Sequence, residues 1–326
     1  MAGSWRTVRR RLLTPSTKET LLETRGFHRK SPEAQQLLET VGRRFLEGYG
    51  YAMEARTAAE AEEWLEAIPV RFRGFAYEGA GMGFAMLDGL PLGGRSGVER
   101  LLAGRGDRHV YMVYVGIGWA MARLPRFRWP DVTELDPLLR WLVLDGYGFH
   151  QAYFRTAKYV HEQYQETGFP WPGDDFPEYA NRAVDQGIGR ALWFVGGTDA
   201  DLVATMIEKF PESRHSDLYG GAGLAATYAG GVDEDELRSF RDRSGAHRAM
   251  VAQGSAFAAE ARIRAGLLTP HTGLATQVFC GTTPAEAALV SQEERPGGAA
   301  AGSVPGYEVW RQSIAGRFTE QGRDRS

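Results

Sequence analysis

The sequence contains a single cysteine, Cys280, among its 326 residues. One cysteine excludes an intramolecular disulfide framework and a zinc site built from several thiolates. An excess of positive charge is also missing, because 38 basic residues stand against 41 acidic ones and the formal net charge is −3. The charge balance therefore gives no support for binding to nucleic acid. We predict no nucleic-acid partner, and we assign no metal-ligating residues.

Long apolar runs are absent as well. The longest run, residues 110–122, is interrupted by two glycines and is shorter than the about 20 residues that a membrane-spanning helix needs. The first residues lack the apolar core of a secretory signal. We expect a cytoplasmic protein without a membrane span. Because no alternating apolar and polar run is bounded by hairpin turn signals, we also expect almost no strands.

Glycine, in contrast, is abundant inside predicted helices. Residues 144–150, Leu-Asp-Gly-Tyr-Gly-Phe-His, lie in a span from Pro137 to about Gln165 that has apolar residues at helical spacing and no proline. A glycine inside a helix costs about 1 kcal/mol relative to alanine. The arrangement recurs at intervals of roughly 34 residues, the period of helix-pair repeats. The first glycines of these Gly-x-Gly motifs are Gly79, Gly116, Gly146, Gly187, Gly221 and, in a degenerate copy, Gly254.

These patterns predict an all-α protein. We expect an array of helical hairpins of tetratricopeptide-like type, open or curled into a toroid, with the Gly-x-Gly motifs in the middle of its helices. The expected organisation is an N-terminal extension over 1–30, a single helical-repeat domain over 31–294, and a flexible linker, short helix and tail over 295–326. The glycines either allow close helix crossing or leave a groove along the concave face, and both interpretations stay open.

Ionisable side chains beside the glycines are the candidate catalytic groups. Glu78 and Asp145 each precede a motif, so they fall at one level of the array if the motifs stack in register. Buried carboxyls need partners, and perturbed acids concentrate at functional sites. Tyr147, His150 and Asp88 complete the predicted catalytic set. The alternatives are a structural acid bonded to an arginine or tryptophan for Asp145, and a satisfied structural histidine for His150.

Aromatic side chains lie on or beside the same helices. Together with glycines they could wall a slot for an elongated apolar ligand, although core packing is the ordinary role of such residues. The predicted substrate-binding residues are Gly81, Gly118, Gly148, Trp119, Phe149, Trp193 and Tyr228.

One acidic segment bears on cofactors. Asp174 and Asp175, followed by Pro177, superficially match the motif that holds magnesium diphosphate in isoprenoid enzymes. The segment reads as a loop with a proline, however, and capping of the next helix accounts for it better. We therefore predict no cofactor, with Mg²⁺ as the alternative.

Several stretches resemble a bacterial family known as a domain of unknown function and found among enediyne antibiotic biosynthesis proteins. The matching stretches are 10–28, 144–150, 187–194 and 217–231. The resemblance implies a role near the polyketide synthase that makes a linear polyene, or in conversion of that polyene to the enediyne core. The leading hypothesis is a protein that binds an elongated apolar intermediate and promotes its rearrangement or cyclisation, with the polyketide synthase or other pathway proteins as partners. The alternatives are an isoprenoid cyclase and a non-catalytic scaffold that binds the intermediate.

Overall fold

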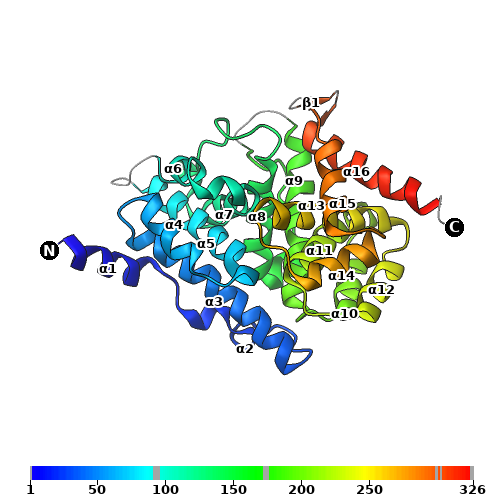
Figure 1. Cartoon of the computed structure of the whole chain (residues 1–326), viewed down its shortest axis with the longest axis horizontal. Coiled ribbons are helices and arrows are strands. Elements are labelled where there is room, and N and C mark those ends of the chain that lie inside the picture. Colours follow the sequence, from blue (N-terminus) through cyan, green and yellow to red (C-terminus); the bar gives the residue numbers. More distant parts are fainter. Residues whose placement is uncertain (1, 91–95, 172–175, 298–299, 302, 324–326) are drawn as a thin grey trace.

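A computed structural model of the chain describes residues 2–90, 96–171, 176–297, 300–301 and 303–323. Its long helices occupy the middle of the molecule (Figure 1). They are α3 (Pro32–Glu54), α5 (Val70–Gly89), α7 (Val110–Arg123), α8 (Trp141–Phe154), α9 (Ala180–Val195), α11 (Glu212–Ala229) and α13 (Arg248–Arg264).

Further α-helices surround this row. They are α1 (Ala2–Leu13), α2 (Leu22–Arg25), α4 (Ala58–Glu66), α6 (Gly97–Leu102), α10 (Ala200–Glu208), α12 (Glu234–Arg243), α14 (Pro270–Phe279), α15 (Pro284–Glu293) and α16 (Gly306–Arg323). The remaining elements are the 3₁₀ turns η1 (Thr17–Thr20), η2 (Arg105–His109), η3 (Arg126–Arg128), η5 (Pro177–Tyr179) and η6 (Gly245–His247), the π-helical turn η4 (Ala157–His161), and the strands β1 (Ala300–Ala301) and β2 (Val304–Pro305). The two short strands pair antiparallel. The all-α prediction is confirmed, whereas the tetratricopeptide-like or toroidal arrangement stays a prediction.

The glycine motifs lie where neighbouring long helices touch backbone to backbone. A Cβ added at Gly187 of α9 would lie 1.8 Å from the carbonyl oxygen of Asp145 in α8, and one added at Gly189 would lie 2.1 Å from the carbonyl oxygen of Leu218 in α11. The first glycine of each motif thus faces the preceding long helix, and the second faces the following one. The same alternation holds for the motifs of α5, α7, α8 and α11. Close crossing is therefore the reason for the helix-interior glycines, and it offsets their intrinsic cost.

Side-chain caps fix the start of several helices. The Ser31 side chain accepts a hydrogen bond from the backbone of Ala34 at the start of α3, and the Thr57 side chain accepts one from Glu60 at the start of α4. These caps satisfy backbone N–H groups that have no partner inside the helix. Residues far apart in sequence then join one hydrophobic core that extends from Leu22 to Phe318.

The helix predicted from Pro137 to about Gln165 is shorter than expected. It spans Trp141–Phe154 as α8, and η4 follows after a break. The break lies at Arg155, whose φ of −125° and ψ of 47° are not helical, while the Thr156 hydroxyl donates to the carbonyl oxygens of Ala152 and Tyr153. The sequence pattern did not reveal this break, because residues 149–161 contain neither proline nor glycine.

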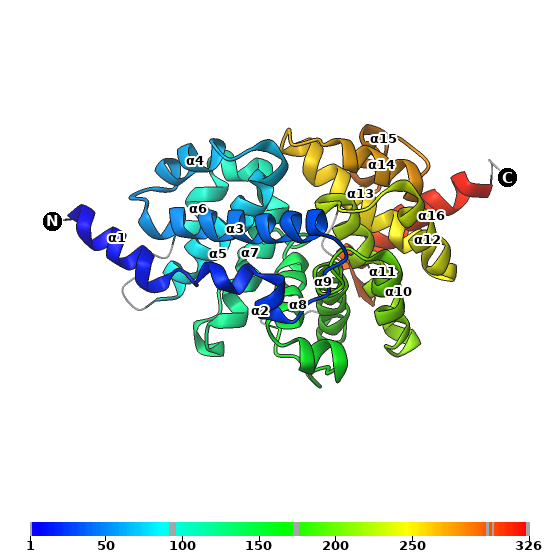
Figure 2. The ribbon, with the colours of Figure 1, turned by 90° about the horizontal axis from the view of Figure 1, so that it is seen from below.

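Both terminal segments pack against the rest of the chain. Figure 2 shows the N-terminal segment running alongside α3, and the backbone N–H of His28 donates to the carbonyl oxygen of Val195 at 3.0 Å. At the other end, α16 buries Tyr307, Trp310 and Arg311 almost completely. Chain segments outside the predicted 31–294 domain thus complete the core of the molecule.

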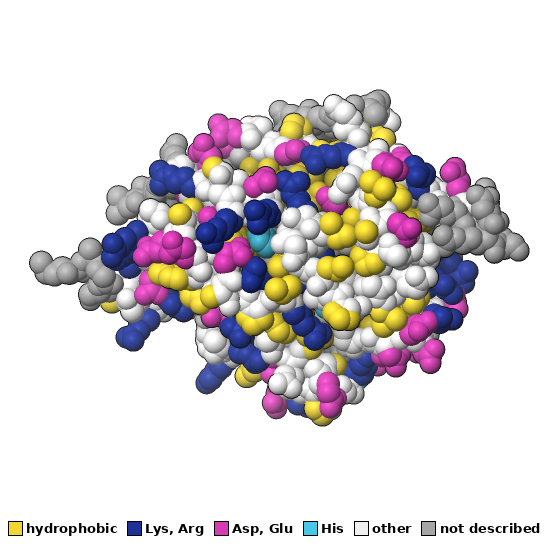
Figure 3. All heavy atoms as spheres, in the orientation of Figure 1, with side chains coloured by type: hydrophobic (Ala, Val, Ile, Leu, Met, Phe, Trp, Pro, Cys, Tyr) yellow, Lys and Arg dark blue, Asp and Glu magenta, His cyan; other side chains and the backbone are white. Residues whose placement is uncertain are grey.

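The surface mixes charges of both signs. Figure 3 shows acidic and basic side chains interspersed over one face, with hydrophobic side chains between them over the C-terminal half. Within the described ranges, none of the helices combines the length and the apolar character needed to span a bilayer.

Candidate functional site

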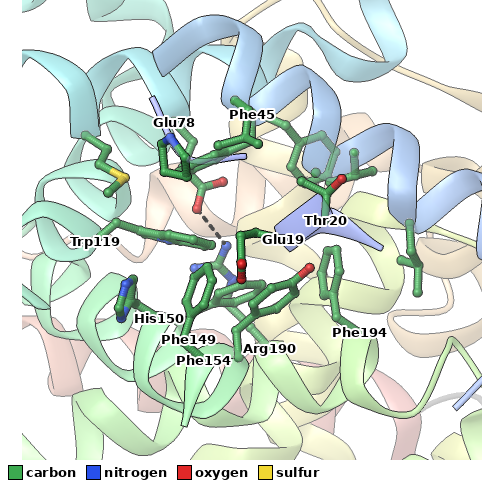
Figure 4. A pocket seen from close by; sticks show the side chains of 18 of the residues that line it. Glu19, Thr20, Phe45, Glu78, Trp119, Phe149, His150, Phe154, Arg190 and Phe194 are labelled. Atoms are coloured by element: carbon green, nitrogen blue, oxygen red, sulfur yellow. Dashed lines mark ion pairs between the residues drawn. The ribbon is translucent and has the colours of Figure 1, made fainter. Parts of the chain in front are cut away.

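A cavity lined mainly by aromatic side chains lies between α3, α5, α7, α8 and α9, with η1 at one side (Figure 4). We call it the first cavity. It holds about 710 Å³ of space free of protein atoms, its open mouth included. Its aromatic walls are Phe45, Phe75, Trp119, Phe149, Tyr153, Phe154 and Phe194. Such a lining suits an apolar ligand, because few polar groups need to lose water when it binds.

Five acidic, basic or histidine side chains interrupt this apolar lining: Glu19 from η1, Glu78 from α5, Arg123 from α7, His150 from α8 and Arg190 from α9. Figure 4 shows Glu78 and Arg190 on facing helices, with a dashed line for their ion pair. The distance between Glu78 Oε1 and Arg190 Nη2 is 3.9 Å, which is at the long end for an ion pair. The Arg190 guanidinium also lies over the Phe149 ring, 5.2 Å from its centroid.

Arg190 has a closer partner on its other side. Its Nη1 atom donates to Asp145 Oδ1, and Gln186 Nε2 donates to Asp145 Oδ2 at 3.0 Å. The Arg190 guanidinium is therefore the cationic partner of two buried carboxyls, and it is bound less tightly to Glu78 than to Asp145. Burial raises the pKa of Glu78 to about 7, although Arg190 opposes the rise, and the charge of Asp145 adds to it. A carboxyl with this pKa can both release and accept a proton at neutral pH.

The backbone positions of these acids are fixed by the glycine crossings. The carbonyl oxygen of Glu78 contacts the Cα of Gly116, where an added Cβ would lie at 2.1 Å, and the carbonyl oxygen of Asp145 faces Gly187 in the same way. The side chains of Asp145 and Gln186 are hydrogen-bonded to each other across α8 and α9. Rigid backbone contacts beside a reactive group help to hold it in one geometry.

His150 differs from the other polar groups because neither of its ring nitrogens has a hydrogen-bond partner among the described residues. Its side chain is only 6% exposed. Burial lowers the pKa of His150 to about 3, and the positive charges of Arg123, Arg155 and Arg25 contribute to the decrease. The imidazole is therefore neutral at pH 7. A neutral imidazole that lacks partners can donate one hydrogen bond and accept another.

A second cavity lies on the far side of Arg190. It is lined by residues of α7, α8, α9, α11, α13 and α16, and it holds about 500 Å³ of space free of protein atoms, any opening included. Asp145, Arg190 and Tyr307 contribute to its walls. Gln186 Nε2 donates to the Tyr307 hydroxyl at 3.0 Å, so α16 joins the polar network around Asp145. Arg190 is thus part of the wall of both cavities.

The comparison with protein families gives one match. The model of a family described as "Protein of unknown function (DUF1702)" matches residues 4–318. The chain belongs to this family. No curated protein and no solved structure gave a match.

In this member of the DUF1702 family, the predicted catalytic residues do not form a single cluster. Glu78 and His150 line the first cavity, whereas Asp145 lies behind Arg190 and lines the second. Asp145 is thus a buried acid bonded to an arginine, the structural alternative considered for it. Among the described residues, none is hydrogen-bonded to either ring nitrogen of His150, which a satisfied structural histidine would require.

Tyr147 and Asp88 lie apart from both cavities. The Tyr147 ring packs against Trp129 and Phe169, with centroid distances of 6.2 and 5.3 Å. Asp88 accepts hydrogen bonds from the backbone N–H groups of Gly97 and Val98 at 2.9 and 3.0 Å. It caps the N-terminus of α6, so a local backbone interaction accounts for its position.

The predicted substrate-binding glycines lie at helix crossings. A Cβ at Gly118 would lie 1.9 Å from a backbone oxygen of α8, and the distances are 2.1 Å to α9 for Gly148 and 2.7 Å to α7 for Gly81. No room for a ligand remains between such backbones, and these glycines shape the fold instead.

The predicted aromatic residues divide between the cavities and the core. Trp119 and Phe149 line the first cavity, and Tyr228 lines the second. Trp193 is fully buried in the core, and its indole N–H donates to the carbonyl oxygen of Gly230 at 3.0 Å.

The predicted alternative cofactor site cannot be placed. Asp174 and Asp175 lie outside the described residues. Over the described part of the chain, no group of at least three His, Cys, Asp or Glu side chains has an arrangement that could hold a metal ion.

The sequence analysis missed three charged residues of the first cavity, Arg190, Arg123 and Glu19. Arg190 directly follows the Gly-x-Gly motif of α9. An arginine at such a position is a usable signal, because a charge in the middle of a buried helix requires an acidic partner. Arg123 ends α7 and carries no comparable signal.

Proposed function

We propose that the chain binds an elongated, largely apolar molecule in the first cavity and moves a proton on it through Glu78. The observation that carries this proposal is a buried carboxyl with a pKa of about 7 in an aromatic cavity. Its nearest ion-pair partner, Arg190, lies 3.9 Å away and is held by Asp145. An acid in such surroundings is suited to general acid–base catalysis.

The proposed reaction is a rearrangement without net oxidation or reduction. Glu78 takes a proton from one carbon of a conjugated chain and returns it to another, which shifts double bonds or closes a ring. The charge of Arg190 stabilises the carboxylate while the proton is on the substrate. The Trp119 and Phe149 rings hold the flat conjugated chain and exclude water from it.

The resemblance to proteins of enediyne biosynthesis supports a specific substrate class. We propose that the ligand is a linear polyene made by a polyketide synthase, and that the chain acts on its way to an enediyne core. A conjugated polyene is elongated, flat and apolar, and these properties match the aromatic lining of the first cavity.

The test is to incubate the purified protein with a linear conjugated polyene. Products are followed by mass spectrometry and by the ultraviolet absorbance, which shifts when conjugation changes. We expect Glu78→Gln to lower turnover by at least about 100-fold, the usual contribution of a general acid–base group. Glu62→Gln is the matched control, since it makes the same change at a buried glutamate of α4 that does not line the first cavity and whose hydrogen-bond partner is the backbone N–H of Gly106.

Three outcomes separate the hypotheses. Turnover that titrates near pH 7 in the wild type and is lost in Glu78→Gln supports the proposal. Equal turnover in Glu78→Gln and the wild type contradicts the role of Glu78. Tight binding of the polyene without any product favours the non-catalytic scaffold.

A further inference from the structure

One end of the first cavity carries polar groups that the proposed proton transfer does not use. His150 lines the cavity there, and Arg123 of α7 lines it as an exposed residue at the mouth. The Trp119 ring contacts the His150 ring edge-to-face with centroids 5.5 Å apart. In Figure 4 the Trp119 ring lies between His150 and Glu78.

The electrostatic environment of His150 is positive. Arg123, Arg155 and Arg25 all lie close enough to His150 to lower its pKa. Arg25 forms an ion pair with Glu19 at 2.9 Å. In contrast, the side chains of Arg123 and Arg155 form neither an ion pair nor a hydrogen bond over the described part of the chain. This end of the cavity therefore has a surplus of positive charge.

The missing partners of His150 strengthen this point. A buried polar atom without a hydrogen bond costs about 1–3 kcal/mol, so both ring nitrogens are expected to gain a partner in a functional state of the protein. Near the His150 ring, Phe154 at 4.6 Å and Trp119 at 5.5 Å are the aromatic neighbours, and neither supplies such a partner. A ligand group that enters the cavity can supply it.

The geometry points to a carboxylate-binding site at this end of the first cavity, in which Arg123 and His150 hold the acid end of the apolar ligand. The rest of the ligand extends past Trp119 and Phe149 toward Glu78. The inference rests on the proposed function, and it specifies the substrate class as a conjugated polyene acid. It also fixes the orientation of the ligand in the cavity, because the proton is moved on carbons that lie beyond the indole of Trp119, as seen from the carboxylate.

A carboxylate fits these groups better than a neutral or a more highly charged end group. An alcohol would give His150 a partner but leave the charge of Arg123 uncompensated. A phosphate brings up to two charges and three acceptor oxygens, more than one donor of a neutral imidazole and one exposed guanidinium can match. A carboxylate accepts one charge-assisted bond from Arg123 and one hydrogen bond from His150.

Parinaric acid, a fluorescent conjugated tetraene fatty acid, is a suitable probe, and its methyl ester has the same chain without the charge. We expect the full-length protein to bind the acid about tenfold more tightly than the ester, as one charge-assisted hydrogen bond predicts. His150→Phe and Arg123→Gln should each reduce this preference severalfold, mainly by weakening the binding of the acid. Arg128→Gln is the control, because it removes the same charge from a nearby residue that does not line the cavity.

The outcomes distinguish this inference from the proposed function. Equal binding of acid and ester in the wild type overturns the carboxylate site and leaves the apolar cavity and the role of Glu78 standing. A preference for the acid that Arg123→Gln and Arg128→Gln reduce equally also overturns it, since the effect is then one of net charge. Binding of neither probe overturns both. Glu78→Gln should keep the preference for the acid.

Discussion

The pKa of Glu78 leads to a measurable effect on stability. A glutamate in the unfolded chain titrates near 4.5, and burial raises the pKa of Glu78 to about 7 in the folded protein. Each unit of difference corresponds to about 1.4 kcal/mol, so the shift amounts to about 3 kcal/mol. Between the two values the folded state holds a proton that the unfolded state has released. The wild type therefore loses this stability as the pH rises from about 4.5 to about 7.

Glu78→Gln keeps the size of the side chain and removes the titration. We expect the variant and the wild type to differ little near pH 4.5 and the variant to be more stable by about 3 kcal/mol near pH 8.5. Urea unfolding across this pH range measures the difference. Glu63→Gln is the control, because Glu63 is exposed on α4 and forms no ion pair among the described residues. If the difference between Glu78→Gln and the wild type does not grow with pH, the argument is refuted.

Three further experiments test other features. Gly187→Ala places a Cβ 1.8 Å from the carbonyl oxygen of Asp145 and should lower the free energy of unfolding by at least about 3 kcal/mol, whereas Gly316→Ala, exposed in α16 with nothing within 4 Å, should raise it by about 0.5–1 kcal/mol. Equal effects in urea unfolding would contradict the crossing role. Arg190→Leu leaves two buried carboxyls without their cation and should cost about 3–5 kcal/mol near pH 8 and less near pH 5, where both protonate more readily; a loss independent of pH would argue against this charge balance. His150→Phe removes unpartnered nitrogens, so thermal unfolding should occur at the same temperature or a few degrees higher, and a large decrease would reveal a structural partner.

Local sequence signals predicted the class of fold. Capping residues such as Ser31 and Thr57 act through the backbone of the next few residues, so their effect can be read from a short window. The Gly-x-Gly motifs also indicated close helix crossing as one of two interpretations. The structure adds that the two glycines of a motif, for example Gly187 and Gly189, face opposite neighbours.

The candidate site was less predictable because it depends on which helices meet. Asp145 and Glu78 occupy equivalent positions in their motifs. Arg190 nevertheless donates a hydrogen bond to Asp145, whereas it lies 3.9 Å from Glu78. No local pattern distinguishes them. The role of α16 was missed for a similar reason: Tyr307 joins the network through its hydrogen bond with Gln186, which lies far away in the sequence.

The walls of the first cavity have a consequence for the order of folding. Successive long helices cross at their glycines, so most of the array can assemble from contacts between neighbours in the chain. The first cavity is different, because Pro15 and Phe194 both line it and His28 is hydrogen-bonded to Val195. The ends of this long loop must meet before the cavity exists, and loop closure over such a separation is slow and entropically costly. During synthesis on the ribosome, the N-terminal segment emerges first but cannot reach its final place until α9 has been made.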